Sequence, residues 1–194
     1  MTKIIARNVY KTYQSVFGEI TAIRDFSLEV AEGEFVCIVG PSGCGKSTFL
    51  RILAGLDHAT AGDVRILPGA DPRKPLNNVV FQEYAIFPWK TVLDNVAFGL
   101  EMRGIAKQER YHVARDWIDR VGLRKFADYY PHQISGGMKQ RVSIARALAN
   151  DPEVLLMDEP LGALDAQTRT VLQEELLRIW EANRKTVVYI THSI

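Results

Sequence analysis

The chain has 194 residues, a formal net charge of +1, and 47% apolar and 24% charged residues. This balance is typical of one soluble globular domain. The near-neutral charge gives no sign of a strongly basic surface for nucleic acid, and leaves open only a local basic patch. No apolar run approaches the roughly 20 residues that span a bilayer, and the first residues lack a secretory leader pattern, so we expect neither secretion nor membrane spanning. The two cysteines, Cys37 and Cys44, lack metal-ligand spacing, which favours a reducing cytoplasm.

The first 30 residues alternate imperfectly between apolar and polar side chains, with Gly18 between two apolar groups. This pattern predicts short antiparallel strands. Tyr13 lies in this region, upstream of a glycine-rich stretch. Its ring could stack on a nucleotide base for roughly 1–3 kcal/mol, but the residues alone favour the alternative of a tyrosine packed between strands.

Residues 40–48, GPSGCGKST, separate an apolar run at 35–39 from a helix predicted to begin near Lys46. The apolar run predicts a buried strand. Glycines let consecutive backbone N–H groups surround an anion, while Lys46 supplies a cation for phosphates and Ser47 a hydroxyl for Mg²⁺. The alternative, a glycine-rich surface turn, is disfavoured by the strand and helix on either side. We therefore predict a nucleoside triphosphate site formed by Gly40, Pro41, Ser42, Gly43, Cys44, Gly45, Lys46, Ser47 and Thr48.

A buried strand is predicted at 78–81 and ends at Gln82. The loop that follows, Glu83–Trp89, holds several large apolar residues, which is typical of a surface that contacts a partner. The alternative is that Phe87 and Trp89 pack onto the following helix.

The pattern is helical from Thr91 to Asn150, and Thr91 can cap the first of these helices. A second helix combines an inward apolar stripe, which includes Ala114 and Ile118, with charged residues on a face that we expect to be solvated. These charged residues are Arg110, Arg115, Asp116, Asp119 and Arg120.

A second helix is predicted to begin with glycines, at Ser135, Gly136 and Gly137. This start could bind an anion, but the residues alone favour the alternative of an ordinary helix cap. Residues 154–157 predict a buried strand with Asp158 and Glu159 at its carboxyl end. Ligands collect at that edge of open α/β sheets, where carboxylates suit Mg²⁺ and the activation of water. A polar exit from the strand is the alternative.

Taken in order, these motifs resemble those of the ATP-binding cassette (ABC) family, over essentially the whole chain. The matching elements are a Walker A loop at 40–48, a Q-loop glutamine at 82, a signature at 135–137, a Walker B segment at 154–160, a D-loop-like GALD at 162–165 and a switch histidine, His192. The resemblance implies a P-loop NTPase of α/β class, with a mainly parallel core sheet, an N-terminal antiparallel β subdomain and an inserted α-helical subdomain. It implies one ABC ATPase domain over 1–194, in which 1–88 and 151–194 form the RecA-like core with the β subdomain and 89–150 the helical subdomain.

The resemblance also implies roles in binding ATP and Mg²⁺. Tyr13 would stack on adenine, and Lys46 with the loop amides would hold the phosphates. Ser47 and Gln82 would complete the Mg²⁺ sphere, which Asp158 would support through water. Hydrolysis would depend on Glu159, which polarises the attacking water, and on His192 at the γ-phosphate, so the implied catalytic residues are Glu159, His192, Gln82 and Lys46.

The family implies a head-to-tail dimer, in which Ser135, Gly136 and Gly137 of one copy close over ATP bound to the other. More narrowly, residues 81–104 and ISGGMKQR resemble the ATPases of nitrate, sulfonate and taurine importers. That likeness implies a peripheral subunit on the cytoplasmic face of a bacterial inner membrane, without a nucleic-acid partner. It would contact a permease through Glu83–Trp89 and depend indirectly on an extracytoplasmic substrate-binding protein.

Two features depart from the family pattern. Met138 replaces a glutamine that many members have, and the chain ends two residues after His192, where relatives usually continue. We therefore expect a shortened chain or a core that lacks its last elements. Two other functions stay open: a soluble ABC-type ATPase that acts on nucleic acid or ribosomes, and a nucleotide-binding module without hydrolysis. The lack of a coiled-coil insertion and of a second cassette disfavours the former, and Glu159 with His192 disfavours the latter.

Overall fold

The structure is a computed structural model that describes residues 1–16, 18–162 and 164–192. Position 163, within the D-loop-like segment, lies outside the described residues. The fold divides into two compact units, which we describe separately. The first unit comprises Met1–Val79, Glu153–Glu159 and the residues from Arg184 on, and the second comprises Val80–Pro152 and Pro160–Asn183.

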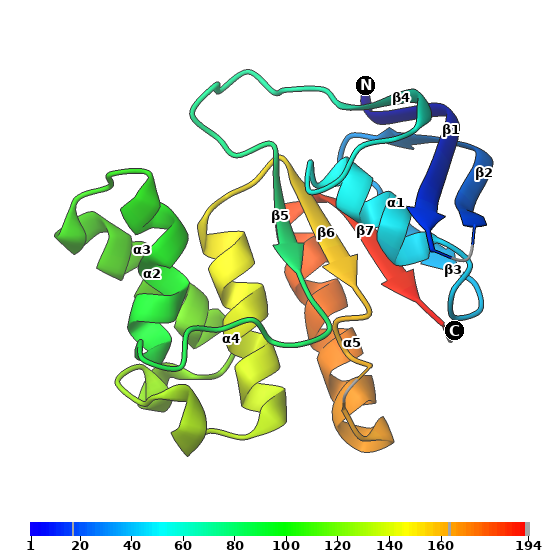
Figure 1. The fold of residues 1–194 in the computed structure, drawn as a ribbon. Coiled ribbons are helices and arrows are strands. Elements are labelled where there is room, and N and C mark those ends of the chain that lie inside the picture. Colours follow the sequence, from blue (N-terminus) through cyan, green and yellow to red (C-terminus); the bar gives the residue numbers. More distant parts are fainter. Residues whose placement is uncertain (17, 163, 193–194) are drawn as a thin grey trace. The chain divides into compact units, whose positions relative to one another are not determined.

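An antiparallel sheet in the first unit has the strand order β2-β1-β4 and is formed by β1 (Thr2–Ser15), β2 (Gly18–Ala31) and β4 (Ala61–Ile66) (Figure 1). The prediction of short strands was wrong, because β1 and β2 each run for 14 residues. Register shifts interrupt their pairing between Ala6 and Val9 and again between Val9 and Lys11. Such bulges break the period-two alternation, so one long strand looks like several short ones in the sequence.

A second sheet has the order β3-β7-β6-β5, from β3 (Phe35–Val39), β7 (Thr186–Thr191), β6 (Val154–Asp158) and β5 (Asn77–Val80). Strand β7 pairs in parallel with both β3 and β6. The central strands β6 and β7 are almost fully buried, as their apolar composition predicts. The prediction that β3 is buried was wrong: Cys37 and Val39 are exposed, because β3 is the outermost strand of the sheet.

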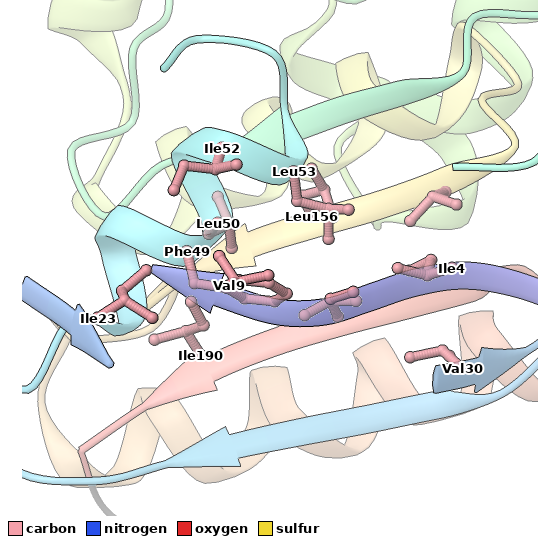
Figure 2. Close-up of a cluster of buried hydrophobic side chains, with 13 residues drawn as sticks. Ile4, Val9, Ile23, Val30, Phe49, Leu50, Ile52, Leu53, Leu156 and Ile190 are labelled. Carbon is pink, nitrogen blue, oxygen red and sulfur yellow. The ribbon is translucent and has the colours of Figure 1, made fainter. Parts of the chain in front are cut away.

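The core of the first unit joins α1 (Lys46–Leu53) to strands of both sheets. Figure 2 shows Phe49, Leu50 and Leu53 of α1 packed among side chains of β1, β6 and β7. Each fully buried side chain of this size contributes roughly 1.5–3 kcal/mol from the removal of apolar surface from water. The helix that follows the glycine-rich loop is therefore firmly anchored. The labelled core residues are Ile4, Val9, Ile23, Val30, Phe49, Leu50, Ile52, Leu53, Leu156 and Ile190.

The second unit is helical, with α2 (Val92–Met102), α3 (Lys107–Arg120), α4 (Gly136–Ala149), α5 (Ala166–Asn183) and the short 3-10 helices η1 (Arg124–Phe126) and η2 (Pro131–Gln133). A buried apolar cluster joins α2, α3 and α4. Thr91 caps α2 as predicted, since its hydroxyl accepts a hydrogen bond from the backbone N–H of Asp94 at 3.1 Å.

Ala114 and Ile118 of α3 are buried, as the apolar stripe predicts. Arg110 was wrongly predicted to lie on a solvated face. Its guanidinium is mostly buried and pairs with the Glu101 carboxylate at 3.2 Å. In the part of the chain that the structure describes, none of the helices has both the length and the apolar composition of a bilayer-spanning segment.

Candidate nucleotide-binding site

The loop of residues 40–45 connects β3 to α1 and requires glycine at specific positions. Gly43 and Gly45 have φ angles of 80° and 96°, which belong to the left-handed region that L side chains rarely adopt. A Cβ on Gly45 would also collide with the backbone carbonyl oxygen of Ala22 and approach Ile23 Cγ1 at 3.2 Å. Both the backbone angle and the space at Gly45 therefore exclude a side chain.

The N-terminus of α1 is suited to an anion. Its N-cap is Gly45, which provides no side-chain cap, and the first turn contains no acidic residue. The first backbone N–H groups of a helix lack intrahelical acceptors and carry a partial positive charge. The cradle formed by this loop and helix end therefore fits a phosphate group.

Lys46 places a buried cation inside the loop. Its ammonium donates hydrogen bonds to the carbonyl oxygens of Gly40 at 2.6 Å and Pro41 at 2.9 Å. Neither partner is charged, and Lys46 forms no ion pair with a carboxylate of the described residues. A buried cation is costly without a counter-charge, which a bound phosphate would supply.

The carboxyl end of β6 provides oxygen ligands beside the helix start. The hydroxyl of Ser47 donates to Asp158 Oδ1 at 2.8 Å. Hydroxyl and carboxylate oxygens are the ligands that hard divalent cations prefer. Two of the three residues assigned to a metal, Ser47 and Asp158, are thus in direct contact, and their donor set fits such a cation.

A second polar contact follows on the same strand. Glu159 Oε2 lies 2.8 Å from Nδ1 of His192, which follows β7. An ionised carboxylate can only accept, so Nδ1 carries the proton in this contact and Nε2 is left to other partners. Glu159 has φ 45°, an uncommon angle for a residue other than glycine, and its N–H donates to the carbonyl of Ile190 at 3.0 Å. Such backbone strain is concentrated at functional sites.

Gln82 and the residues Ser135–Gly137 belong to the second unit, whereas the phosphate-binding loop belongs to the first. Gln82 follows β5 and its side chain is exposed. Ser135 caps α4 by accepting from the backbone N–H of Met138 at 3.3 Å. A Cβ on Gly136 would lie 2.7 Å from the Tyr84 hydroxyl oxygen, so a side chain there would force the Tyr84 side chain to shift.

The aromatic loop Glu83–Trp89 combines packing with exposure. Phe87 packs on α2 through Phe98, at 4.5 Å between ring centroids, as the packing alternative predicts. Trp89 instead remains 71% exposed. Arg146 of α4 donates to the carbonyl of Ala85 at 2.8 Å and so fixes the middle of the loop.

Asn95 is a buried residue that the sequence analysis missed. Its amide oxygen accepts from the N–H of Phe87 at 2.7 Å, and its amide nitrogen donates to the carbonyls of Phe87, Lys90 and Thr91 at 3.1, 3.0 and 2.9 Å. One feature of the sequence could have indicated a buried Asn95: this polar residue lies among the apolar residues of a predicted helix, next to Val96. Asn95 thereby determines the backbone path of the aromatic loop.

The substitution Asn95→Leu is expected to lower the free energy of unfolding by about 1–3 kcal/mol, because the N–H of Phe87 loses its acceptor in a buried position. Chemical denaturation measures this change. The matched control is Gln108→Leu, which removes an exposed amide from α3 and should change stability by less than about 0.5 kcal/mol. Equal stability of the two variants would contradict the role of Asn95.

A strand, a glycine-rich loop and a helix, with carboxylates at the end of another strand of the same sheet, define a P-loop nucleoside triphosphatase. Residues 23–162 match the family model described as ABC transporter. The chain therefore belongs to the ABC transporter family, as an ATP-binding cassette that hydrolyses ATP.

Similar proteins carry names from the same family. An uncharacterized ABC transporter ATP-binding protein of Methanocaldococcus jannaschii is 53% identical over 99% of this chain and 72% of its own length. The nitrate import ATP-binding protein NrtD of Synechocystis is 47% identical over 91% of this chain and 67% of its own length. The taurine import ATP-binding protein TauB of Burkholderia pseudomallei is 48% identical over 100% of this chain and 75% of its own length.

Solved structures confirm the fold class. A dimeric bacterial ABC transporter cassette has a TM-score of 0.84 and 39% identity, covering 98% of this chain and 88% of that one. A dimeric post-hydrolysis state of an ATP-binding cassette, bound to ADP and Pi, has a TM-score of 0.85 and 38% identity, with the same coverage.

Proposed function

We propose that the chain is the ATP-hydrolysing subunit of an importer for a small solute, in particular an anion of the nitrate, sulfonate or taurine type. The observation that carries the hydrolytic part is the arrangement at the carboxyl end of β6. There Asp158 contacts Ser47 at the start of α1, and Glu159 contacts His192. No observation favours the alternative of an ATPase that acts on nucleic acid or ribosomes.

The phosphate-binding loop would bind and orient the triphosphate. Backbone N–H groups of residues 40–48 and the ammonium of Lys46 would neutralise its charge, and Tyr13 would stack on the adenine. Ser47 and Gln82 would hold Mg²⁺, with Asp158 acting through water. When bound, Mg²⁺ supplies charge stabilisation to the transferring phosphoryl group.

Glu159 would orient and polarise the attacking water, since its carboxylate is at the end of β6 and already contacts a proton donor. His192 would use Nε2, the nitrogen not engaged by Glu159, to contact the γ-phosphate. Phosphoryl transfer is catalysed mainly by positioning and charge stabilisation, which is what these contacts would supply.

The site would be completed by a second copy of the chain in a head-to-tail dimer. Ser135, Gly136 and Gly137 of that copy would contact the ATP with the N-terminus of α4. The capped but glycine-rich start of α4 supports this role. The similar cassette reported above is dimeric in both of its solved structures. ATP would thus act as part of the dimer interface, and hydrolysis would weaken it.

The aromatic loop Glu83–Trp89 would contact the permease, and an extracytoplasmic substrate-binding protein would deliver the solute. These partners would place the chain peripherally on the cytoplasmic face of a bacterial inner membrane. The nitrate and taurine import proteins among the relatives support this assignment. In this scheme residues 1–88 and 151–194 form the catalytic core with its β subdomain, and residues 89–150 the helical signature subdomain.

The test is to purify the chain with its permease in lipid and to measure ATP turnover with a binding protein loaded with nitrate, with taurine or with neither. We expect one loaded form to raise turnover severalfold over the unloaded form. Equal turnover in all three conditions would contradict the proposed solute class. Stimulation by DNA or by ribosomes would support the other class of ATPase.

The substitution Trp89→Glu is expected to abolish this stimulation while the ATPase activity of the isolated chain persists. Trp89 is 71% exposed, so a charge there costs little stability, but it would prevent apolar contact with the permease. Phe87 is a poorer probe because it packs on Phe98. Loss of ATP binding in Trp89→Glu would contradict a role confined to the partner contact.

A further inference from the structure

A cluster of three side chains surrounds the ring of Tyr13 within the first unit. Asp57, which follows α1, accepts from the Tyr13 hydroxyl through Oδ2 at 2.7 Å. Its other oxygen, Oδ1, accepts from the Lys11 ammonium at 2.6 Å and from the backbone N–H of His58 at 2.7 Å. Lys11 also donates to the carbonyl of His58 at 2.9 Å. Both carboxylate oxygens are therefore engaged, and one of them holds the tyrosine.

Lys11 and Tyr13 are two residues apart on β1, and both side chains reach the carboxylate of Asp57. The Lys11 ammonium lies over the Tyr13 ring, 4.6 Å from its centroid. A cation at this distance is attracted by the face of an aromatic ring. The ring is thus fixed at its hydroxyl end by Asp57 and covered on one face by Lys11, yet Tyr13 is still 38% exposed.

The carboxylate of Asp57 keeps its charge at any physiological pH. Hydrogen bonds from Lys11 above all, then from Tyr13 and from the N–H of His58, hold the pKa of Asp57 well below its usual range. Asp57 therefore remains an ionised acceptor for the Tyr13 hydroxyl at physiological pH. Asp57 and Tyr13 are 44 positions apart in the sequence, so the hydrogen bond between them is a tertiary contact.

We propose that Asp57 and Lys11 are positioning residues for the nucleotide base. Asp57 holds the hydroxyl end of the Tyr13 ring, and Lys11 occupies one face, so that the opposite face becomes the stacking surface for adenine. This inference rests on the proposed role of Tyr13 as the adenine-stacking residue. A ring that is already oriented loses less conformational freedom when a base stacks on it, which raises the affinity.

The experiment compares the affinity of the purified chain for ATP and for inorganic tripolyphosphate, both with Mg²⁺. Asp57→Asn replaces the charged acceptor of the Tyr13 hydroxyl and the Lys11 ammonium by a neutral amide. It is expected to lower the affinity for ATP about three- to tenfold and to leave that for tripolyphosphate within about twofold. Tripolyphosphate lacks a base, so a general disturbance of the phosphate-binding loop would lower both affinities. The matched control is Asp63→Asn, which removes an exposed partner of Arg65 from the same sheet and should change neither affinity.

Tyr13→Phe removes the hydrogen bond between Tyr13 and Asp57 entirely and retains the ring, so it tests the inference even if Asp57→Asn folds poorly. We expect Tyr13→Phe and the double variant to bind ATP equally, because Asp57 acts through the tyrosine hydroxyl. An equal loss of ATP and tripolyphosphate affinity in Asp57→Asn would overturn the inference.

Tyr13→Ala separates this inference from the proposed function. If Tyr13→Ala weakens ATP binding and Asp57→Asn does not, the positioning role is wrong and the stacking role stands. If Tyr13→Ala binds ATP as tightly as the unmodified chain, the stacking role itself is wrong, and the inference falls with it.

Discussion

Glu159→Gln is expected to bind ATP and to hydrolyse it about 10²-fold or more slowly than the unmodified chain. Glutamine has the shape of glutamate but no negative charge, so it cannot polarise a water molecule in the same way. The change also replaces the charged acceptor that Glu159 Oε2 offers to His192 Nδ1 at 2.8 Å. The Glu159→Gln variant should therefore accumulate with ATP bound. It should be dimeric if the second copy closes over the nucleotide.

Steady-state release of phosphate measures the turnover, and size-exclusion chromatography with ATP measures the dimer. A suitable control is Glu174→Gln on α5, whose exposed carboxylate pairs with the exposed Arg178, and which should retain turnover within about twofold. Near-normal turnover of Glu159→Gln would refute the assigned role. Loss of ATP affinity would show that Glu159 is needed for binding as well.

Gly45→Ala is expected to lower the affinity for ATP about tenfold or more. The added methyl group would meet the carbonyl oxygen of Ala22, and alanine would have to adopt φ 96°. The angle alone costs about 1–2 kcal/mol, and the collision forces the loop to move, which displaces the N–H groups that would bind phosphate. Isothermal titration with ATP measures the loss.

Gly55→Ala provides the matched control for this prediction. Gly55 has a similar φ of 74°, but a Cβ there would have no heavy atom within 4 Å. Both variants are therefore strained, whereas only Gly45→Ala is crowded. If the two variants bind ATP equally tightly, the contact with Ala22 does not shape the phosphate-binding loop.

Features with a local cause could be predicted from the sequence. Thr91 and Ser135 cap their helices because a hydroxyl at an N-cap accepts from the backbone three residues on, and this depends on no distant residue. The phosphate-binding loop is likewise a local succession of strand, glycines and helix. The ABC family, the ATPase activity and the α/β P-loop class, all expected from the order of the motifs, are confirmed.

Features that depend on distant partners could not be predicted. The exposure of β3 is set by its place at the edge of the sheet, because its apolar residues would also suit a central strand. The contact between Asp57 and Tyr13 joins a turn to a strand, and no spacing rule connects them. Asn95 carried a weak signal, but only the structure shows that its amide holds the backbone from Phe87 to Thr91.

The hydrogen bonds of Lys46 also affect the affinity for a nucleotide. An ammonium has three N–H groups, and two of them already point at the carbonyls of Gly40 and Pro41. A lysine side chain carries about 2 kcal/mol of rotamer entropy, and most of it has been lost in folding before any ligand arrives. The Lys46 ammonium is therefore already held in place when a phosphate binds, and little further side-chain entropy is lost. Arginine, whose planar guanidinium cannot reproduce these two contacts in the same space, would not replace it.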